Sequence, residues 1–178
     1  MNIESLQIFS QNVRKNKTLT ETILETEKNS TDIILIQEPP QYITKYVPSP
    51  HNADGDPVQG HLSHPEWTTY ARPPNNQDDI PRVITYINKR LQNLQPMLRR
   101  DIIDHRDINL TSLTINHSCA FILNIYSNES HTAISFLRNH ELNIDNTIIM
   151  TGDFNVWDSD CVMNHLSCTK FFSIFLFF

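Results

Sequence analysis

Near the N-terminus, apolar residues fall into two short runs that flank a segment with helical spacing. Residues 6–9 predict a short strand, and Thr18–Lys28 places apolar side chains on one face of a helix and glutamates on the other. Residues Asp32–Ile36 are almost wholly apolar, as expected of a strand buried on both faces. Together the three elements predict a βαβ unit with parallel strands and a right-handed crossover, and hence an α/β fold.

The middle of the chain has a different composition. Nine of the ten prolines lie between Pro39 and Pro81, and Asp54-Gly55-Asp56 is a turn signal. We interpret this segment as a long loop, interrupted by one short strand at Trp67–Ala71. The pattern after it predicts three strands, a helix and a last strand, at Arg82–Ile87, Asn109–Ile115, Cys119–Tyr126, Ser130–Leu142 and Thr147–Met150.

Three of the predicted strands run directly into an acid or an amide. The first leads into Gln11-Asn12, the second into Gln37-Glu38, and the last into Gly152-Asp153-Phe154-Asn155. Open α/β sheets place their functional side chains at the carboxyl ends of their strands. Carboxylate and amide oxygens suit a hard cation such as Mg²⁺ and the attack of water on phosphate.

The balance of charge limits how the chain could contact nucleic acid. With 14 Lys and Arg against 20 Asp and Glu, the net charge is −6, so overall basic character is lacking. Contact with DNA must therefore come from a local patch or through a metal. Candidate cations are Arg14, Lys15 and Lys17 beside Asn12, and a second group that a solvated surface explains equally well, Lys89, Arg90, Arg99 and Arg100.

Length and cysteine content indicate the compartment and the number of domains. The chain of 178 residues fits one domain. Its cysteines, Cys119, Cys161 and Cys168, are odd in number without a CxxC spacing, which indicates neither a disulfide framework nor a zinc site. The N-terminus lacks a signal-peptide pattern, and no window reaches the ~18 apolar residues of a membrane span. We expect an intracellular protein, the nucleus included, without membrane contact.

Four short motifs, taken in order, resemble those of the endonuclease/exonuclease/phosphatase family. They are Gln11-Asn12, Gln37-Glu38, Asn124-Ile125-Tyr126-Ser127-Asn128 and Gly152-Asp153-Phe154-Asn155. Asn12-Val13-Arg14, Gln37-Glu38-Pro39-Pro40, Arg82-Val83-Ile84-Thr85-Tyr86 and Trp157-Asp158 look most like its retrotransposon (LINE-type) branch. The resemblance implies an α/β/β/α sandwich, a domain over residues 1–170, and DNA as the partner.

The resemblance also implies a metal site. Glu38 would be the principal ligand of Mg²⁺, with Mn²⁺ as an alternative, and Asn12 would help to hold the metal or its water. A single carboxylate at a strand end can bind Mg²⁺ while the ion keeps several waters. From the residues alone, Glu38 could equally be a surface carboxylate and Asn12 a strand-end amide bonded to backbone.

Four further residues match catalytic positions of the family. Asp153 would orient or deprotonate the attacking water, and Asn155 would contact the scissile phosphate and fix that aspartate. Tyr126 would direct its hydroxyl toward phosphate, with Asn128 as the polar residue after it. The alternatives are an Asx-type turn for Gly-Asp-Phe-Asn and a packing role for Tyr126.

Two departures from the family affect these expectations. Asn155-Val156-Trp157-Asp158 runs on directly, where retrotransposon-type members place a His pair and a Pro before Trp-Asp. The resemblance covers roughly residues 3–167, and the family's C-terminal Ser-Asp-His has no counterpart before Phe178. We therefore expect a domain that is incomplete at its C-terminus, with an apolar tail at residues 171–178.

The leading interpretation is Mg²⁺-dependent phosphodiester hydrolysis by a DNA endonuclease of retroelement type, inactive or weak if the fragment acts alone. One alternative is a phosphatase of the same family that acts on small phosphates. Another is a catalytically dead remnant or binding module of the same fold. The Trp157-Asp158 and Arg82-to-Tyr86 motifs favour DNA, and the missing histidine favours the remnant.

Overall fold

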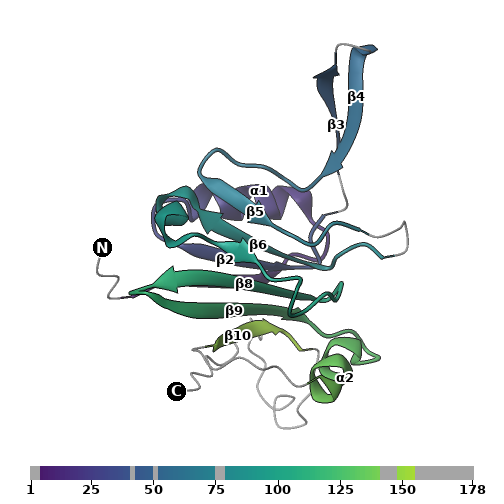
Figure 1. Ribbon diagram of the computed structural model, residues 1–178. Helices are drawn as coiled ribbons and strands as arrows, with labels where there is room; N and C mark the ends of the chain where they lie inside the picture. Colours follow the sequence, from purple (N-terminus) through teal and green to yellow (C-terminus); the bar gives the residue numbers. More distant parts are fainter. Residues whose placement is uncertain (1–4, 41–42, 50–51, 75–78, 141–147, 155–178) are drawn as a thin grey trace, which may run out of the picture.

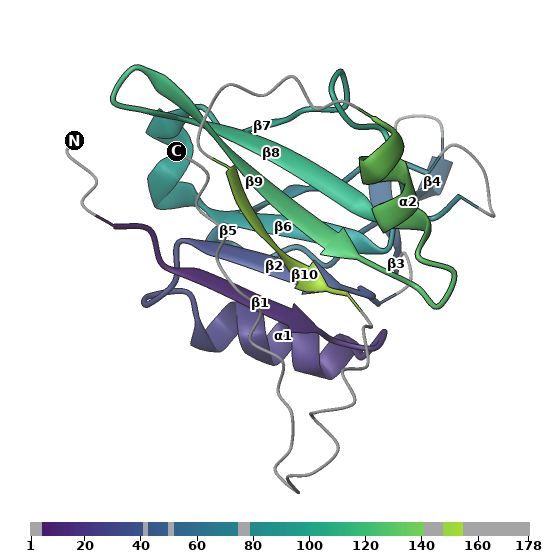
Figure 2. The ribbon, with the colours of Figure 1, turned by 90° about the horizontal axis from the view of Figure 1, so that it is seen from below.

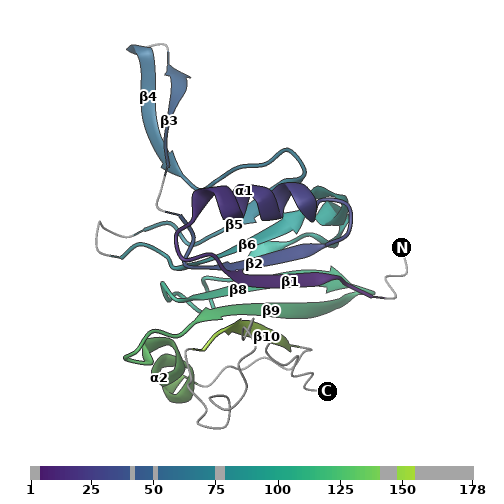
Figure 3. The same ribbon diagram turned by 180° about the vertical axis from the view of Figure 1, so that it is seen from behind.

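The computed structural model describes residues 5–40, 43–49, 52–74, 79–140 and 148–154. Its elements form four layers, with two sheets face to face between two helices (Figure 1). Helix α1 (Lys17–Thr26) covers the outer face of the first sheet, and α2 (Thr132–Asn139) lies against the second (Figure 3). This is the α/β/β/α sandwich that the sequence predicts.

The first sheet has the order β1-β2-β6-β5. Strands β1 (Ile8–Asn12) and β2 (Ile33–Gln37) are parallel and joined through α1, which confirms the predicted βαβ unit. Strand β6 (Val83–Asn88) pairs antiparallel with β2, and β5 (Trp67–Tyr70) antiparallel with β6. The side chain of Asn16 accepts a hydrogen bond from the Leu19 amide at 3.0 Å and so begins α1.

The second sheet has the order β10-β9-β8-β7. Strand β9 (Ser118–Tyr126) pairs antiparallel with β8 (Ile108–Ile115) and parallel with β10 (Ile148–Asp153). The 3₁₀ helix η1 (Lys89–Leu94) leads from the first sheet to the short strand β7 (Met97–Leu98). Viewed from the side of the second sheet, the strands of the two sheets cross at an angle (Figure 2).

The interpretation of Pro39–Pro81 as a loop with one short strand is wrong in part. Strands β3 (Ile43–Ser49) and β4 (Asn52–Gly60) form an antiparallel two-stranded hairpin that projects from the sandwich (Figures 1 and 3). Proline is tolerated there because a two-stranded hairpin has only edge strands. The register shifts between Val47 and Ser49, on either side of Pro48.

Strand β2 is buried on both faces, as its apolar sequence predicts. Ile34 and Ile36 pack into a core cluster with Leu24 of α1, and Ile33 and Leu35 pack into a second cluster between the sheets. A third cluster fills the space between the second sheet and α2 with Ile108, Leu110, Phe121, Leu123, Ile125, Ala133, Phe136 and Leu137. The sandwich therefore has three apolar layers.

The face between the sheets becomes polar toward one end. On β2, Gln37 follows Leu35 on the inner face, and its side chain donates to Asn124 Oδ1 of β9 at 2.6 Å. Both side chains are almost completely buried, with 1% and 0% exposure. Asn124 Nδ2 in turn donates to the carbonyl of Ile84 at 2.9 Å. These bonds join the two sheets directly beneath the carboxyl ends of β1, β2 and β9.

Helix α2 is shorter than the predicted Ser130–Leu142. It begins at Thr132, after His131, whose left-handed φ of 50° precedes the helix without a side-chain cap bond, and the Thr132 amide donates to the Asn128 side chain at 3.1 Å. Helix α2 ends at Asn139, and residues 141–147 lie outside the described part of the chain. So do the expected domain end at residue 170 and the apolar tail at 171–178.

Candidate active site

Three strands bring Asn12, Glu38 and Asp153 to one edge of the sandwich. Asn12 ends β1, Glu38 follows β2, and Asp153 ends β10. Strands β1 and β2 are parallel, as are β9 and β10, so the carboxyl ends of each pair meet at one edge. The two sheets present these edges to each other, since β1 contacts β10.

The amide of Asn12 joins carboxylates from both sheets. Its Nδ2 donates to Glu38 Oε2 at 2.9 Å and to Asp153 Oδ2 at 2.7 Å. Its Oδ1 accepts from the backbone N–H of Arg14 at 2.8 Å. Asn12 and Asp153 are 141 positions apart in the sequence, so this contact depends on the complete stacking of the two sheets. Asn12 is therefore more than a strand-end amide bonded to backbone.

The position of Glu38 depends on an unusual backbone angle. Residues of a strand alternate between its faces, so Glu38 would be directed away from Gln37 if β2 continued. Its φ of 46° lies in the left-handed region and ends the alternation. The N–H of Glu38 donates to the carbonyl of Arg82 at 2.8 Å, and its carbonyl accepts from the Lys15 amide at 2.7 Å. These two bonds hold the residue in this conformation.

Tyr126 lies beside the two carboxylates. It ends β9, pairs with Asp153 of β10, and is 9% exposed. Burial raises the pKa of the Tyr126 phenol, and the charge of Glu38 and a hydrogen bond to Glu38 raise it further, whereas Arg82 lowers it. The phenol therefore stays protonated at neutral pH and can donate a hydrogen bond.

Arg82 and Asp107 form an ion pair that sequence reasoning did not assign to the site. Both Nε and Nη2 of Arg82 donate to the Asp107 carboxylate, which is 1% exposed. The Arg82 guanidinium lies over the Tyr126 ring, with Cζ 4.8 Å from the ring centroid. The Arg82-to-Tyr86 motif was noted only as a family resemblance, and no spacing in the sequence pairs residues 82 and 107.

Two predicted site residues are not brought to this cluster by any described contact. The Asn128 Oδ1 accepts from the backbone N–H of Thr132, the first residue of α2, at 3.1 Å, so it faces the helix start. Asn155 lies outside the described residues, as do Trp157 and Asp158. Their roles remain predictions.

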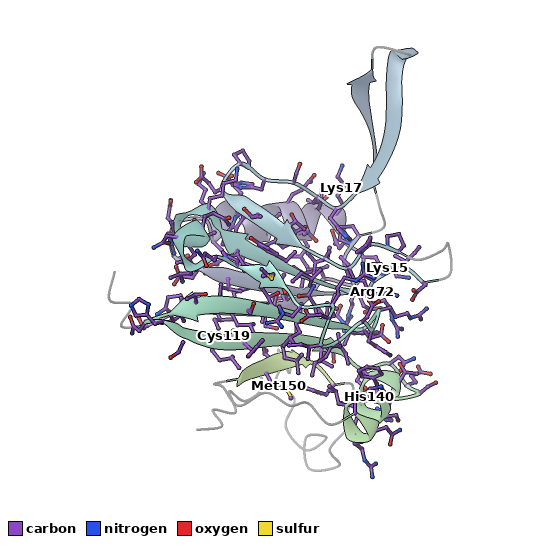
Figure 4. All side chains as sticks on the ribbon, in the orientation of Figure 1. Lys15, Lys17, Arg72, Cys119, His140 and Met150 are labelled. Carbon is purple, nitrogen blue, oxygen red and sulfur yellow. The ribbon has the colours of Figure 1, made fainter. Side chains whose placement is uncertain are left out.

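The two groups of candidate cations differ in their surroundings. Arg14 and Lys15 are exposed and directly follow β1, both with left-handed φ angles. Lys15 lies at the end of the sandwich opposite Cys119 (Figure 4). In the second group, Arg90, Arg99 and Arg100 form ion pairs with aspartates, which favours their interpretation as ordinary surface charges. Only the first group lies beside Asn12 and Glu38.

The chain matches no protein-family model, and no curated protein matches it. Among solved structures it is similar to the endonuclease domain of TRAS1, a telomere-specific non-LTR retrotransposon. The TM-score is 0.61 at 14% sequence identity, and the match covers 87% of this chain and 62% of that domain. A protein of the endonuclease/exonuclease/phosphatase family from Leptotrichia buccalis C-1013-b matches with a TM-score of 0.47 at 11% identity, covering 85% of this chain and 67% of that one.

The chain has the fold of the TRAS1 endonuclease domain. The resemblance seen in the four motifs is thus confirmed for the fold. At 14% identity the likeness to the TRAS1 domain extends to the fold alone, and this chain spans 62% of that domain's length.

On this endonuclease/exonuclease/phosphatase fold, the donor set at the strand ends suits a hard divalent cation. Two carboxylates, Glu38 and Asp153, lie together around the Asn12 Nδ2 and offer oxygen ligands, while the Asn12 Oδ1 accepts from the Arg14 N–H. Mg²⁺ is commonly bound through one or two carboxylates while it keeps several waters. Within the described part of the chain, no group of three or more His, Cys, Asp or Glu side chains is placed so that it could hold a metal ion.

Proposed function

We propose that this protein is a metal-dependent phosphodiesterase that cleaves DNA as an endonuclease. The observation that supports the proposal most is the Asn12 amide, which donates to Glu38 of one sheet and Asp153 of the other. A phenol beside these carboxylates adds a hydrogen-bond donor for phosphate. Such a combination of acids, amide and phenol is suited to the attack of water on a phosphodiester.

In this proposal each residue has a separate role. Glu38 is the principal ligand of Mg²⁺, and Asn12 holds Glu38 and Asp153 in place. The metal, when bound, stabilises negative charge on the phosphate oxygens. Asp153 orients the attacking water and accepts its proton, and Tyr126 donates a hydrogen bond to the phosphate. Asn155 contacts the scissile phosphate. Asn128 is the polar residue that follows Tyr126 in the same motif.

DNA is the proposed substrate because the exposed cations of the first group lie next to these residues. Arg14 and Lys15 lie two and three positions after Asn12, and both residues are exposed. Lys17 lies at the start of α1 and pairs only loosely with Glu21, at 3.6 Å with both side chains more than half exposed. Cations on an otherwise acidic molecule can hold the phosphates that flank a cleavage site. The TRAS1 likeness supports the retroelement type.

Nicking of supercoiled plasmid in the presence of Mg²⁺ or Mn²⁺ tests the proposal. We expect weak nicking by the wild type and a loss of roughly 10²-fold or more in Glu38→Gln and in Asp153→Asn. Glu66→Gln is the matched control, because Glu66 is an exposed carboxylate just before β5, at the opposite end of the first sheet from Glu38. We expect it to nick as the wild type does.

Two other outcomes would reject the proposed endonuclease. Release of phosphate from small phosphate esters without nicking would identify a phosphatase of the same fold. Binding of Mg²⁺ that Glu38→Gln weakens, without hydrolysis of either substrate, would identify a catalytically inactive module.

A further inference from the structure

The carboxylate of Asp107 is a buried acceptor at the start of strand β8. It receives Nε and Nη2 of Arg82 and, at 3.1 Å, the hydroxyl of Thr132 from helix α2. A carboxylate with 1% exposure requires such compensation, because burial of an unpaired charge is strongly unfavourable. Two parallel N–H bonds to one carboxylate also fix the plane of the guanidinium.

The plane of the Arg82 guanidinium determines how Arg82 contacts Tyr126. The Arg82 Cζ lies 4.8 Å from the centroid of the Tyr126 ring, within the range of a cation–π contact. Arg82 reaches the ring from the first sheet, whereas Tyr126 belongs to the second. The contact therefore restricts the ring from the side of the opposite sheet and holds it near Glu38, whose charge raises the Tyr126 pKa.

The backbones of the same two residues hold the ends of two site strands. The carbonyl of Arg82 accepts from the Glu38 N–H at 2.8 Å, and the carbonyl of Asp107 accepts from the Tyr126 N–H at 2.9 Å. The Arg82 N–H donates to the Arg106 carbonyl at 2.8 Å. The ion pair thus contacts Glu38 through the Arg82 backbone, and Tyr126 through the Arg82 side chain and the Asp107 backbone.

We propose that the Arg82–Asp107 pair is a positioning device that fixes Tyr126 and Glu38 relative to each other, and that Arg82 acts through them rather than by binding substrate. The proposal rests on the proposed function for its kinetic part and on the geometry alone for its structural part. The Nε and Nη2 groups of Arg82 both donate to Asp107. This arrangement argues against a role of Arg82 in binding a phosphate group. Arg82 and Asp107 are therefore positioning residues.

A structural readout comes from the ring itself. The Arg82 guanidinium lies over the Tyr126 ring, so its removal changes the surroundings of that ring. With 3-fluorotyrosine incorporated at all five tyrosines, ¹⁹F NMR reports the chemical shift of each ring at one neutral pH, and Tyr126→Phe assigns the signal. We expect the Tyr126 signal to move toward the position of a solvent-exposed fluorotyrosine in Arg82→Met/Asp107→Asn, which leaves no buried charge unpaired.

Arg90→Met is the matched control. Arg90 pairs with Asp32 at 2.9 Å, beside the start of β2 and so at the opposite end of that strand from Glu38. We expect no shift of the Tyr126 signal there. An unchanged Tyr126 chemical shift in the Arg82→Met/Asp107→Asn variant would overturn the positioning device, whether or not the protein cleaves DNA.

Kinetics separate positioning from substrate binding. We expect Arg82→Met/Asp107→Asn to lower kcat for plasmid nicking by roughly 10–100-fold with little change in KM, since misplacement of a catalytic group acts mainly on kcat. Combined with Tyr126→Phe, the same change should add little further loss, because both act through one ring. A raised KM with unchanged kcat would instead make Arg82 a substrate ligand and reject the proposal.

Arg82→Lys provides a second test if the double variant does not fold. It keeps the charge beside Asp107 but loses the planar fork. We expect reduced kcat together with a changed Tyr126 ¹⁹F chemical shift, and full kcat would contradict the proposal. If the wild type does not nick DNA, the proposed function fails, whereas the ¹⁹F chemical shift still decides the structural part.

Discussion

Glu38 shows how much of the site depends on the conformation of one residue. The sequence predicts an acid at the end of β2, but alternation along the strand would turn that acid away from Asn12. The left-handed φ of 46° is what brings its carboxylate to the amide. No pattern in the sequence signals a positive φ at a glutamate, since glycine and asparagine adopt it most readily. The residue was therefore predictable, and its geometry was not.

His61 gives a prediction for the dependence of stability on pH. Burial lowers its pKa from 6.5 to about 4. In the unfolded chain the imidazole binds a proton below pH 6.5, whereas in the folded protein it stays neutral until about pH 4. The stability that the neutral His61 provides is therefore complete above pH 6.5 and is lost as the pH falls from 6.5 toward 4.

We expect the free energy of unfolding to fall by roughly 2 kcal/mol more in the wild type than in His61→Gln between about pH 7.5 and pH 5. Urea unfolding at the two pH values measures this difference. A slope that is the same in both proteins would show that His61 titrates normally in the folded state.

Gly152 limits strand β10 in a way that the strand pattern alone does not reveal. A Cβ on Gly152 would lie 2.0 Å from the carbonyl oxygen of Ile125 on the paired strand β9. Real Cβ atoms do not approach backbone so closely, so the strand would have to move. Because Asp153 is the next residue, that movement would also displace its carboxylate from Asn12.

We expect Gly152→Ala to destabilise the protein by about 1–3 kcal/mol and to weaken Mg²⁺ binding as measured by calorimetry. Gly60→Ala is the control, because a Cβ on Gly60 meets nothing within 4 Å. Equal stability of the two variants would mean that β10 adapts without cost.

The elements that the sequence predicted correctly are those with a strong apolar pattern. Strands β2, β6, β8, β9 and β10 and helix α1 follow it closely. The hairpin β3–β4 was missed because its prolines and its Asp-Gly-Asp read as loop signals. The pairing of Arg82 with Asp107 was missed for another reason: it joins residues of different sheets, and periodicity says nothing about contacts between elements. The strand-end acids were predictable because each follows its own apolar run.

At the scale of the whole molecule, the site requires the two sheets to stack in one position. Apolar layers tolerate sliding, because hydrophobic contact has no direction. The buried amides of Gln37 and Asn124 do have direction, and they bond across the sheets at 2.6 Å. Asn124 also donates to backbone carbonyls of β2 and β6. We interpret this polar layer as the feature that aligns Asp153 with Asn12.

This interpretation predicts different effects on stability and on the site. Asn124→Leu alone removes the acceptor of the Gln37 amide on β9 and the donor to two carbonyls, although Gln37 keeps its bond to Ser10 Oγ. We expect a loss of roughly 1–3 kcal/mol in urea unfolding. Gln37→Leu/Asn124→Leu should lose less than the sum of the single variants, since both polar side chains are replaced together. Gln92→Leu, which removes an exposed amide contact with Thr68, should change stability by less than about 0.5 kcal/mol.

We expect the contacts of Asn12 to change in the double variant even though its loss of stability is smaller than the sum of the single variants. If the polar layer aligns the sheets, the double variant should remain folded while the Asn12 side-chain amide loses its bonds to Glu38 and Asp153. The ¹⁵N–¹H signals of that amide, assigned with Asn12→Ser, would then move toward the positions of solvent-exposed asparagines. Unchanged Asn12 signals in a stable double variant would show that apolar packing alone aligns the sheets. A shift of the Asn12 signals would show that the buried Gln37–Asn124 layer determines where Glu38 and Asp153 meet, although it contributes little to stability.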